Sequence, residues 1–161
     1  MGKTIENQKV TANHRDKVVV FMIGMRINKW WAIHKWLPVA LAMPKMIKEQ
    51  YQNPSLGCLA MESFSGLRTT FLLQYWRSEE DLMNYAKGGT HLKAWKEFNQ
   101  RNANNHAVGI YHETYIVQPN QMESLYVNMP VFGLAKLAGF TPINKHLKSA
   151  KQRLHRTSSP S

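Results

Sequence analysis

The segment Lys17–Met25 constrains the fold more than any other part of the sequence. It reads Lys-Val-Val-Val-Phe-Met-Ile-Gly-Met, with large apolar residues at consecutive positions. An amphipathic helix or a half-exposed strand would bring polar residues to one side, so a strand buried on both faces fits this run best. The sheet that contains it must therefore be covered on both faces.

Two helical regions and three further strands follow. The interval Pro38–Tyr51 has apolar residues at mostly helical spacing, and we expect Pro38 to interrupt or restart a short helical piece that begins near Trp30. A second helix is predicted from Ser78, which can cap it, and is broken at Gly88-Gly89 before a further helical piece. The predicted strands are Leu56–Phe64 and Thr69–Trp76, which form a hairpin, and Ala107–Val117.

The resulting order is strand, helix, strand, strand, helix, strand. This is the plan of the ferredoxin-like α+β fold, in which helices cover one face of an antiparallel sheet. Because the strands carry apolar residues at both odd and even positions, we expect the second face to pack on another copy of the chain. The predicted assembly is a homodimeric α+β barrel.

The ends of the chain are predicted to be polar extensions. We expect a tail over residues 1–16, the barrel domain over 17–134 and a basic extension over 135–161, with little contribution to folding beyond about Leu147. The net charge is +11, but no acidic residue follows Glu123, so much of the excess lies in the basic extension. This distribution argues against specific nucleic-acid binding and leaves a weak contact of that extension with an anionic surface as an option.

The sequence disfavours membrane and secreted proteins and proteins with a disulfide, a metal or a nucleotide cofactor. The longest apolar stretches are too short to span a membrane, and Met1–Lys17 is not a secretory signal, so we expect a cytoplasmic protein. Cys58 is the single cysteine, which leaves no internal disulfide and no Cys-based metal site. Phosphate-binding loops, dinucleotide fingerprints and His-x-x-x-His spacing do not occur, so we expect neither a metal nor a nucleotide cofactor.

The last strand has the most informative polar residues. Alternation along a strand places His112 with Ile110 and Thr114 on one face, and Glu113 with Tyr115 on the other, so His112 and Glu113 cannot form a catalytic pair. His112 is either a structural histidine held by hydrogen bonds or a catalytic base.

Four more residues are candidates for a site near the helix termini. Arg77 could bind an anionic group or form an ion pair in the Ser78–Asp81 turn, and Trp76 could belong to the core or to a pocket wall. His91 and Trp95 are four residues apart and share one helix face, so both could line a cavity, although His91 could also be a capping residue.

Several short motifs together resemble a known family. They are Met43-Pro-Lys-Met, Gln74-Tyr-Trp-Arg-Ser, Tyr85-Ala, His91 with Ala94-Trp95, the segment Val108–Tyr115, and Asn128-Met-Pro. In this order they resemble the family of the fumagillin-pathway monooxygenase, from about Val18 to Leu134. The resemblance implies a dimeric α+β barrel related to antibiotic-biosynthesis monooxygenases, which use oxygen without a metal or flavin. Haem enzymes of the same superfamily, such as aldoxime dehydratases, use His as the iron ligand, which makes His91 and His112 eligible here.

These observations lead to one hypothesis with two alternatives. We expect a cofactor-independent monooxygenase for an apolar enolisable or phenolic compound, with His112 as base and Arg77 or Tyr115 as the partner of the anion. Trp76, His91, Trp95 and Met129 are expected to bind the substrate. The alternatives are a haem enzyme, either aldoxime dehydratase-like or haem-degrading, and a dimer that binds a small molecule without catalysis.

Overall fold

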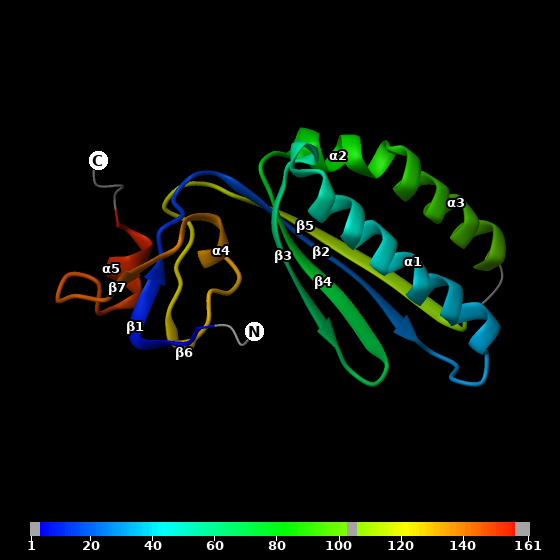
Figure 1. Cartoon of the computed structure of the whole chain (residues 1–161), viewed down its shortest axis with the longest axis horizontal. Helices are drawn as coiled ribbons and strands as arrows, with labels where there is room; N and C mark the ends of the chain where they lie inside the picture. Colours follow the sequence, from blue (N-terminus) through cyan, green and yellow to red (C-terminus); the bar gives the residue numbers. More distant parts are fainter. Residues whose placement is uncertain (1–3, 103–105, 157–161) are drawn as a thin grey trace.

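The computed structural model describes residues 4–102 and 106–156. Its larger part is a four-stranded antiparallel sheet with the strand order β3-β4-β2-β5. These strands are β2 (Val18–Ile27), β3 (Cys58–Ser65), β4 (Thr69–Trp76) and β5 (Val108–Val117). The helices α1 (Ile33–Gln52), α2 (Glu79–Lys87) and α3 (Gly89–Asn102) cover one face of this sheet (Figure 1). This arrangement confirms the predicted ferredoxin-like α+β fold.

Local chemistry explains where the helices begin and end. Ser78 accepts a hydrogen bond from the Asp81 amide and caps α2, as the sequence indicates, and three acidic residues occupy the first turn of that helix. Helix α1 differs from the prediction, because it starts at Ile33 and continues through Pro38 and Pro44. A proline removes one backbone donor, and here the rest of the helix tolerates that loss.

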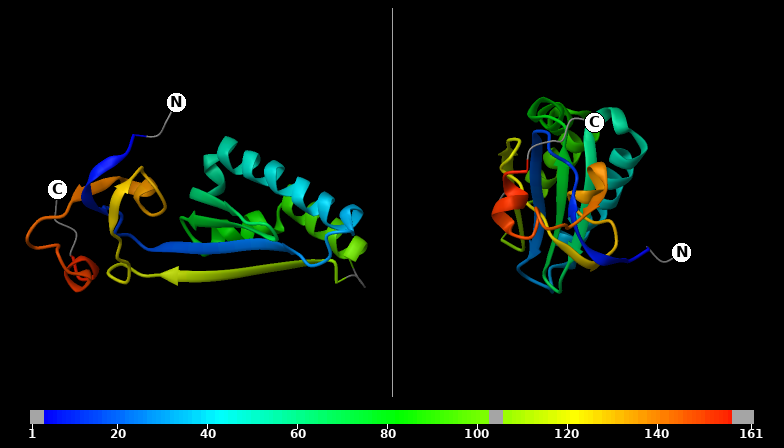
Figure 2. Two further views of the ribbon diagram at one scale, coloured as in Figure 1. Left: turned by 90° about the horizontal axis from the view of Figure 1, so that it is seen from below. Right: turned by 90° about the vertical axis from the view of Figure 1, so that its left-hand side faces the viewer.

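A smaller sheet with the order β6-β1-β7 lies beyond one end of the main sheet (Figure 2). It consists of β1 (Glu6–Ala12), β6 (Tyr126–Met129) and β7 (Phe140–Pro142), and the short helices α4 (Ala135–Ala138) and α5 (Ala150–Leu154) accompany it. A 3₁₀ turn, η1 (Pro54–Leu56), completes the elements. None of the helices in the described part of the chain is both long and apolar enough to cross a membrane.

The small sheet corrects the expectation of polar tails. Residues 6–12 form a strand whose last three side chains, Val10, Thr11 and Ala12, are buried. At the other end, Arg153 of α5 is buried, pairs with Glu123 and donates to the carbonyl oxygens of Leu147 and Lys148. The sequence of β1 has apolar residues only at its end, and Arg153 is a cation within a basic segment, so neither shows its burial in the local pattern.

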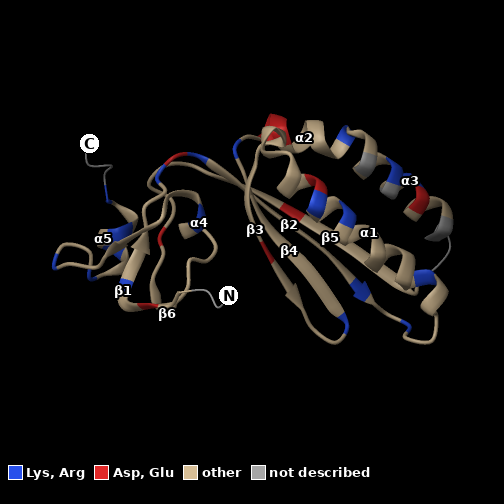
Figure 3. Ribbon diagram, viewed as in Figure 1, with Lys and Arg blue, Asp and Glu red and all other residues tan. Residues whose placement is uncertain are grey.

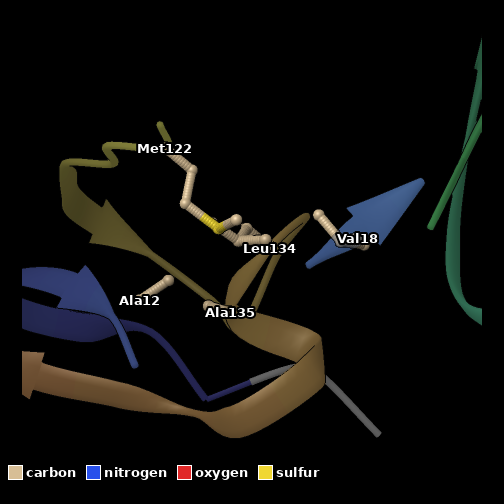
Figure 4. Packing of buried hydrophobic residues seen from close by; sticks show 5 residues of the cluster. All are labelled: Ala12, Val18, Met122, Leu134 and Ala135. Carbon is tan, nitrogen blue, oxygen red and sulfur yellow. The ribbon is translucent and has the colours of Figure 1, made fainter. Parts of the chain in front are cut away.

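Two apolar clusters hold the parts together. Ala12, Val18, Met122, Leu134 and Ala135 join the small sheet to the start of β2, and Figure 4 shows these side chains converging. On the helix side of the main sheet, Val19, Trp76, Leu82 and Tyr85 form the second cluster. Strand β2 contributes Val18 to one cluster and Val19 to the other, which agrees with the prediction that it is buried on both faces.

A buried carboxylate strengthens the contact between α4 and the main sheet. Glu62 of β3 accepts hydrogen bonds from the Gly133 amide and is paired with Lys136, both at 2.8 Å. Gly133 has φ +56°, and a Cβ atom there would lie 3.2 Å from the Tyr75 hydroxyl, so a larger residue would be strained. The segment before α4 is thereby fixed against the face of the sheet that the long helices leave open.

Replacing Arg153 with Ala tests whether the C-terminal segment contributes to folding. The change removes a buried ion pair and the donors of two carbonyl groups, so we expect the free energy of unfolding to fall by about 2–4 kcal/mol. Lys151→Ala, on the exposed side of the same helix, is the matched control and should change it by less than about 0.5 kcal/mol. Urea unfolding measures both, and equal midpoints for the two variants would mean that α5 does not dock.

Candidate functional site

A pocket of about 450 Å³ lies between the main sheet and the three long helices. Its walls are mostly apolar, with Phe21, Ile23 and Leu72 from the sheet and Val39, Met43 and Met46 from α1 among them. Seven lining residues carry polar side chains: Gln50, Gln74, Tyr85, His91, Glu97, His112 and Thr114. An apolar cavity with a few polar groups is the usual form of a small-molecule site.

His112 stands on the sheet wall of this pocket. It pairs with Ile23 of β2 and lines the cavity with Ile110 and Thr114, as the alternation along the strand predicts. Its ring lies 5.8 Å from that of Phe21, between centroids, and the residue is exposed. The structure gives its imidazole no hydrogen bond to any described residue. The interpretation of a structural histidine held by hydrogen bonds therefore lacks support.

The floor of the pocket is a chain of buried hydrogen bonds. The Trp76 indole Nε1 donates to Gln74 Oε1, and Gln74 Nε2 donates to Gln50 Oε1, both at 2.9 Å. Gln50 in turn bonds the Tyr85 hydroxyl, which donates to Glu49 Oε2 at 3.4 Å. All these bonds run in one direction from the indole to the carboxylate. The amide of each glutamine has a second N–H group, so both can still donate to a ligand.

Tyr85 connects the main pocket to a smaller hollow of about 270 Å³. Tyr85 and His91 line both cavities, and Glu49 and Asn84 line the smaller one. Burial is the main factor that raises the pKa of Tyr85 to about 12, and the charge of nearby Glu49 adds to it. The phenol is therefore a neutral hydrogen-bond donor at neutral pH.

The helix wall places His91 and Trp95 together, as their spacing predicts. Both line the pocket, and the Trp95 ring stacks on that of Phe98 at 5.7 Å between centroids. His91 Nδ1 lies 2.9 Å from the carbonyl oxygen of Ala86 and its ring packs 5.7 Å from that of Tyr85. When Nδ1 donates to that carbonyl, Nε2 is left as the unprotonated nitrogen of a neutral imidazole.

Three of the expected site residues lie elsewhere. Arg77 binds Asp81 through two hydrogen bonds of 2.8 and 2.9 Å, which confirms the ion-pair interpretation and leaves it outside the pocket lining. Tyr115 is on the opposite face of β5, where its hydroxyl donates to Glu113. Met129 ends β6 in the small sheet. The expected grouping of Arg77, Tyr115 and Met129 with His112 is therefore corrected.

Trp76 has a supporting role behind the pocket. It is fully buried in the cluster with Val19, Leu82 and Tyr85, and it reaches the cavity only through its hydrogen bond to Gln74. The core interpretation of Trp76 is the one that the structure supports.

Sequence reasoning missed Gln50 and Gln74. Gln74 had a signal, because it is a polar residue in the apolar run Phe71–Trp76 and shares a strand face with Leu72 and Trp76. Gln50 had none, since it follows Lys48 and Glu49 in a helix and resembles any exposed position. No group of three or more His, Cys, Asp or Glu within the described ranges could hold a metal ion.

Replacing Gln74 with Leu tests the hydrogen-bond chain. The change leaves the Trp76 indole and the Gln50 amide oxygen buried without partners, so we expect a loss of about 2–4 kcal/mol in the free energy of unfolding. Gln52→Leu, at an exposed position of α1, serves as the control and should be close to neutral. In a double-mutant cycle, Gln50→Leu should cost less when Gln74 is already Leu; strictly additive costs would show that the two amides do not interact.

Solved structures with the same fold include aldoxime dehydratases. One of them, OxdRE in complex with butyraldoxime, has a TM-score of 0.68 at 16% identity, over 82% of this chain and 40% of that chain. Another aldoxime dehydratase has a TM-score of 0.64 at 19% identity, over 86% of this chain and 43% of that one. At such identities the likeness shows the fold.

Sequence comparison identifies a family. Monooxygenase af470 of Aspergillus fumigatus (strain ATCC MYA-4609 / CBS 101355 / FGSC A1100 / Af293) is 27% identical over 130 residues, which cover 71% of this chain and 44% of that protein. The chain thus spans less than half the length of this relative and of the two aldoxime dehydratases. The sequence pattern of the family described as Monooxygenase af470-like matches residues 18–134, which include all of β2 to β5 and the three long helices. The chain belongs to the Monooxygenase af470-like family.

Proposed function

We propose that this chain is a monooxygenase that acts, without a cofactor, on an apolar compound with an enolisable or phenolic group. The observation that carries the proposal is the position of His112, an exposed imidazole on the wall of an otherwise apolar pocket. Family membership supports the general class of reaction. The pocket supports the apolar character of the substrate.

The two polar regions of the sheet wall suggest the size of the substrate. His112 is on β5 and Gln74 is on β4, and both strands flank β2. Two strand spacings and an offset along the strands separate their backbones by about 10–12 Å. A compound of two or three fused rings could lie on Phe21 and Ile23, with its acidic group at His112 and a distal oxygen at Gln74.

In the proposed reaction His112 removes a proton from an activated CH₂ group of the substrate. The carbanion gives electrons to O₂, a C–O bond forms, and the imidazolium returns its proton to the peroxide. Loss of water, which takes the second hydrogen of the same carbon, leaves a carbonyl group. The substrate supplies all four electrons that reduce O₂, so the reaction needs no external reductant.

Hydrogen-bond donors must stabilise the negative charge that forms on the substrate. Arg77 is bound to Asp81 and Tyr115 faces the other side of the sheet, so neither is proposed for this role. The second N–H groups of Gln74 and Gln50 replace them in the proposal, since both residues line the pocket and are held by the buried chain. Donors that are fixed before the reaction lower the cost of forming an anion.

Replacing His112 with Ala should reduce the rate of oxygen uptake by roughly 10²- to 10⁴-fold, because the reaction loses its base. Its melting temperature should stay nearly unchanged, since the His112 side chain is exposed and makes no hydrogen bond to a described residue. His34→Ala, at an exposed position of α1, is the matched control and should keep the parent's rate of oxygen uptake and its melting temperature. Oxygen consumption with quinols, phenols and ketones with an activated CH₂ group measures the rate.

Two results would contradict the proposal. One is a His112→Ala variant that turns over as fast as the parent protein. The other is a parent protein that consumes no oxygen with any compound of these classes.

A haem enzyme is the second candidate, and His91 is the observation that favours it. With Nδ1 donating to the Ala86 carbonyl, Nε2 is the free nitrogen, which is the usual arrangement of a metal-bound histidine. The apolar lining of the pocket is also compatible with a porphyrin. His91 would hold the iron, and the haem would supply redox or Lewis-acid chemistry. A haemin titration distinguishes the two candidates: a sharp Soret band that His91→Ala abolishes and His112→Ala retains would favour the haem enzyme.

We also propose that the chain forms a homodimer through the face of the main sheet opposite the helices. The small sheet covers one end of this face, at Val18, Val20 and Tyr75. Farther along, Met22 and Tyr111 are only partly buried and Tyr115 is 50% exposed. A second copy would cover these apolar groups and complete the barrel.

Sedimentation velocity at micromolar concentration should show a dimer. Tyr115→Lys would bring a charge into the apolar contact, so we expect it to weaken the dimer at least about tenfold. Tyr51→Lys is the control, because Tyr51 is exposed on α1 and lies on the helix side of the molecule. A parent protein that sediments as a monomer would contradict the barrel.

A further inference from the structure

Arg15 is a buried cation, and two of its three donor atoms have no partner among the described residues. It lies in the connection between β1 and β2 and is 9% exposed. Its Nη1 atom donates to the carbonyl oxygen of His14 at 3.3 Å. Its Nε and Nη2 atoms are buried and have no hydrogen-bond partner within the described chain. These two atoms form one edge of the guanidinium group.

A second buried guanidinium atom lies in the same part of the molecule. Nη1 of Arg156, two residues after α5, is also buried and has no partner in the part of the chain that the structure describes, and the same holds for Nε2 of His14. The segments that carry the two residues lie side by side, because Arg153 pairs with Glu123 and the hydroxyl of the next residue, Ser124, accepts a hydrogen bond from the amide of Ala12. Burial and the positive charge of Arg156 also lower the pKa of Arg15. Figure 3 shows that blue segments predominate around α5.

Neither guanidinium is neutralised by a described carboxylate. Glu123 is bound to Arg153, and the charge of Asp16 acts on His14. The sequence after Glu123 contains no further acidic side chain. A buried cation and a partly buried one, each with a buried donor that lacks a partner, are costly side by side unless an anion lies between them. An unsatisfied buried group of this kind points to a bound ion.

Arg77 in the same chain shows which ligand such an edge binds. Its Nε and Nη2 atoms hold the two carboxylate oxygens of Asp81 at 2.8 and 2.9 Å. Arg15 has the same two atoms available. In Arg15 they are buried, whereas Arg77 is exposed. A planar fork of this type binds two oxygens of a carboxylate or a phosphate group.

We propose that Arg15 and Arg156 form a binding site for a small oxyanion of the phosphate or sulfate class. Two oxygens accept from Nε and Nη2 of Arg15, and a third accepts from Nη1 of Arg156. A doubly charged tetrahedral anion matches two guanidinium groups in charge and in the number of acceptors. Arg156 is only partly buried and provides the access from solvent.

The site would fasten the two ends of the chain to the main sheet. Arg15 lies five residues or fewer from β1 and β2, and Arg156 follows the helix that Arg153 docks. An anion between them links the start of β2 to the C-terminal segment. Binding therefore stabilises the folded chain, and the pocket between the sheet and the helices takes no part.

Thermal unfolding with sulfate or phosphate, against chloride at equal ionic strength, tests the site. The parent protein should show a saturable rise in melting temperature, roughly 5–10 °C at a hundredfold excess over the dissociation constant. Arg156→Gln should lose the saturable rise and bind at least about tenfold more weakly by calorimetry. Lys151 is an exposed cation of α5, and Lys151→Gln should keep the saturable rise and the affinity of the parent.

The behaviour without oxyanion gives a second readout. In chloride alone Arg156→Gln should melt at or above the temperature of the parent, because the variant no longer holds a second positive charge beside the buried Arg15. When sulfate is added, the parent should have the higher melting temperature of the two. Acetate, which carries one charge, should give a smaller rise; an equal or larger rise would show that the site is built for a carboxylate. Equal responses of the parent and Arg156→Gln to sulfate, or no saturable response of the parent, would overturn the proposal.

Discussion

The two-sided burial of β2 is the constraint on which the rest of the structure depends. Val19, Phe21, Ile23 and Met25 point toward the helices, while Val18, Val20 and Met22 point to the other side. The first set supplies the base of the pocket, and the second set receives the small sheet at one end. Because β2 lies between β4 and β5, it also sets the spacing between Gln74 and His112. One strand thus fixes the core, the junction of the two sheets and the width of the site.

The polar groups of the pocket are held in two different ways. Gln74 and Gln50 belong to a buried chain that extends from the Trp76 indole to the Glu49 carboxylate, so their positions are fixed by several partners at once. His112 is exposed, and its ring lies beside that of Phe21. In the reaction proposed above, the fixed donors would hold the anion while His112 moves the proton.

The sequence was informative where a local pattern reports burial. The apolar run at Lys17–Met25, the Ser78 cap and the alternation around His112 all predict the elements and the side of the sheet on which each residue lies. The predictions failed where burial depends on distant partners. Arg153 is buried because Glu123 and two carbonyl groups surround it, and Gln50 is buried because Gln74 lies opposite. Neither residue differs from an exposed one in its own neighbourhood of the sequence. Arg77 is an intermediate case, because its position before the Ser78–Asp81 turn was compatible both with an ion pair and with binding of a ligand.

The alternation of β5 has an evolutionary consequence. The imidazole of His112 faces the pocket, and the carboxylate of Glu113 and the phenol of Tyr115 face away. A slip of β5 by one residue against β2 would exchange the two sets, since successive side chains point to opposite faces. One codon gained or lost inside β5, ahead of His112, would turn an imidazole-lined cavity into one lined by an acid and two phenols, and would bring the histidine to the opposite face of the sheet. The chemistry of the pocket and the composition of the opposite face of the sheet are therefore inherited together, and a single frame-preserving insertion or deletion would alter both.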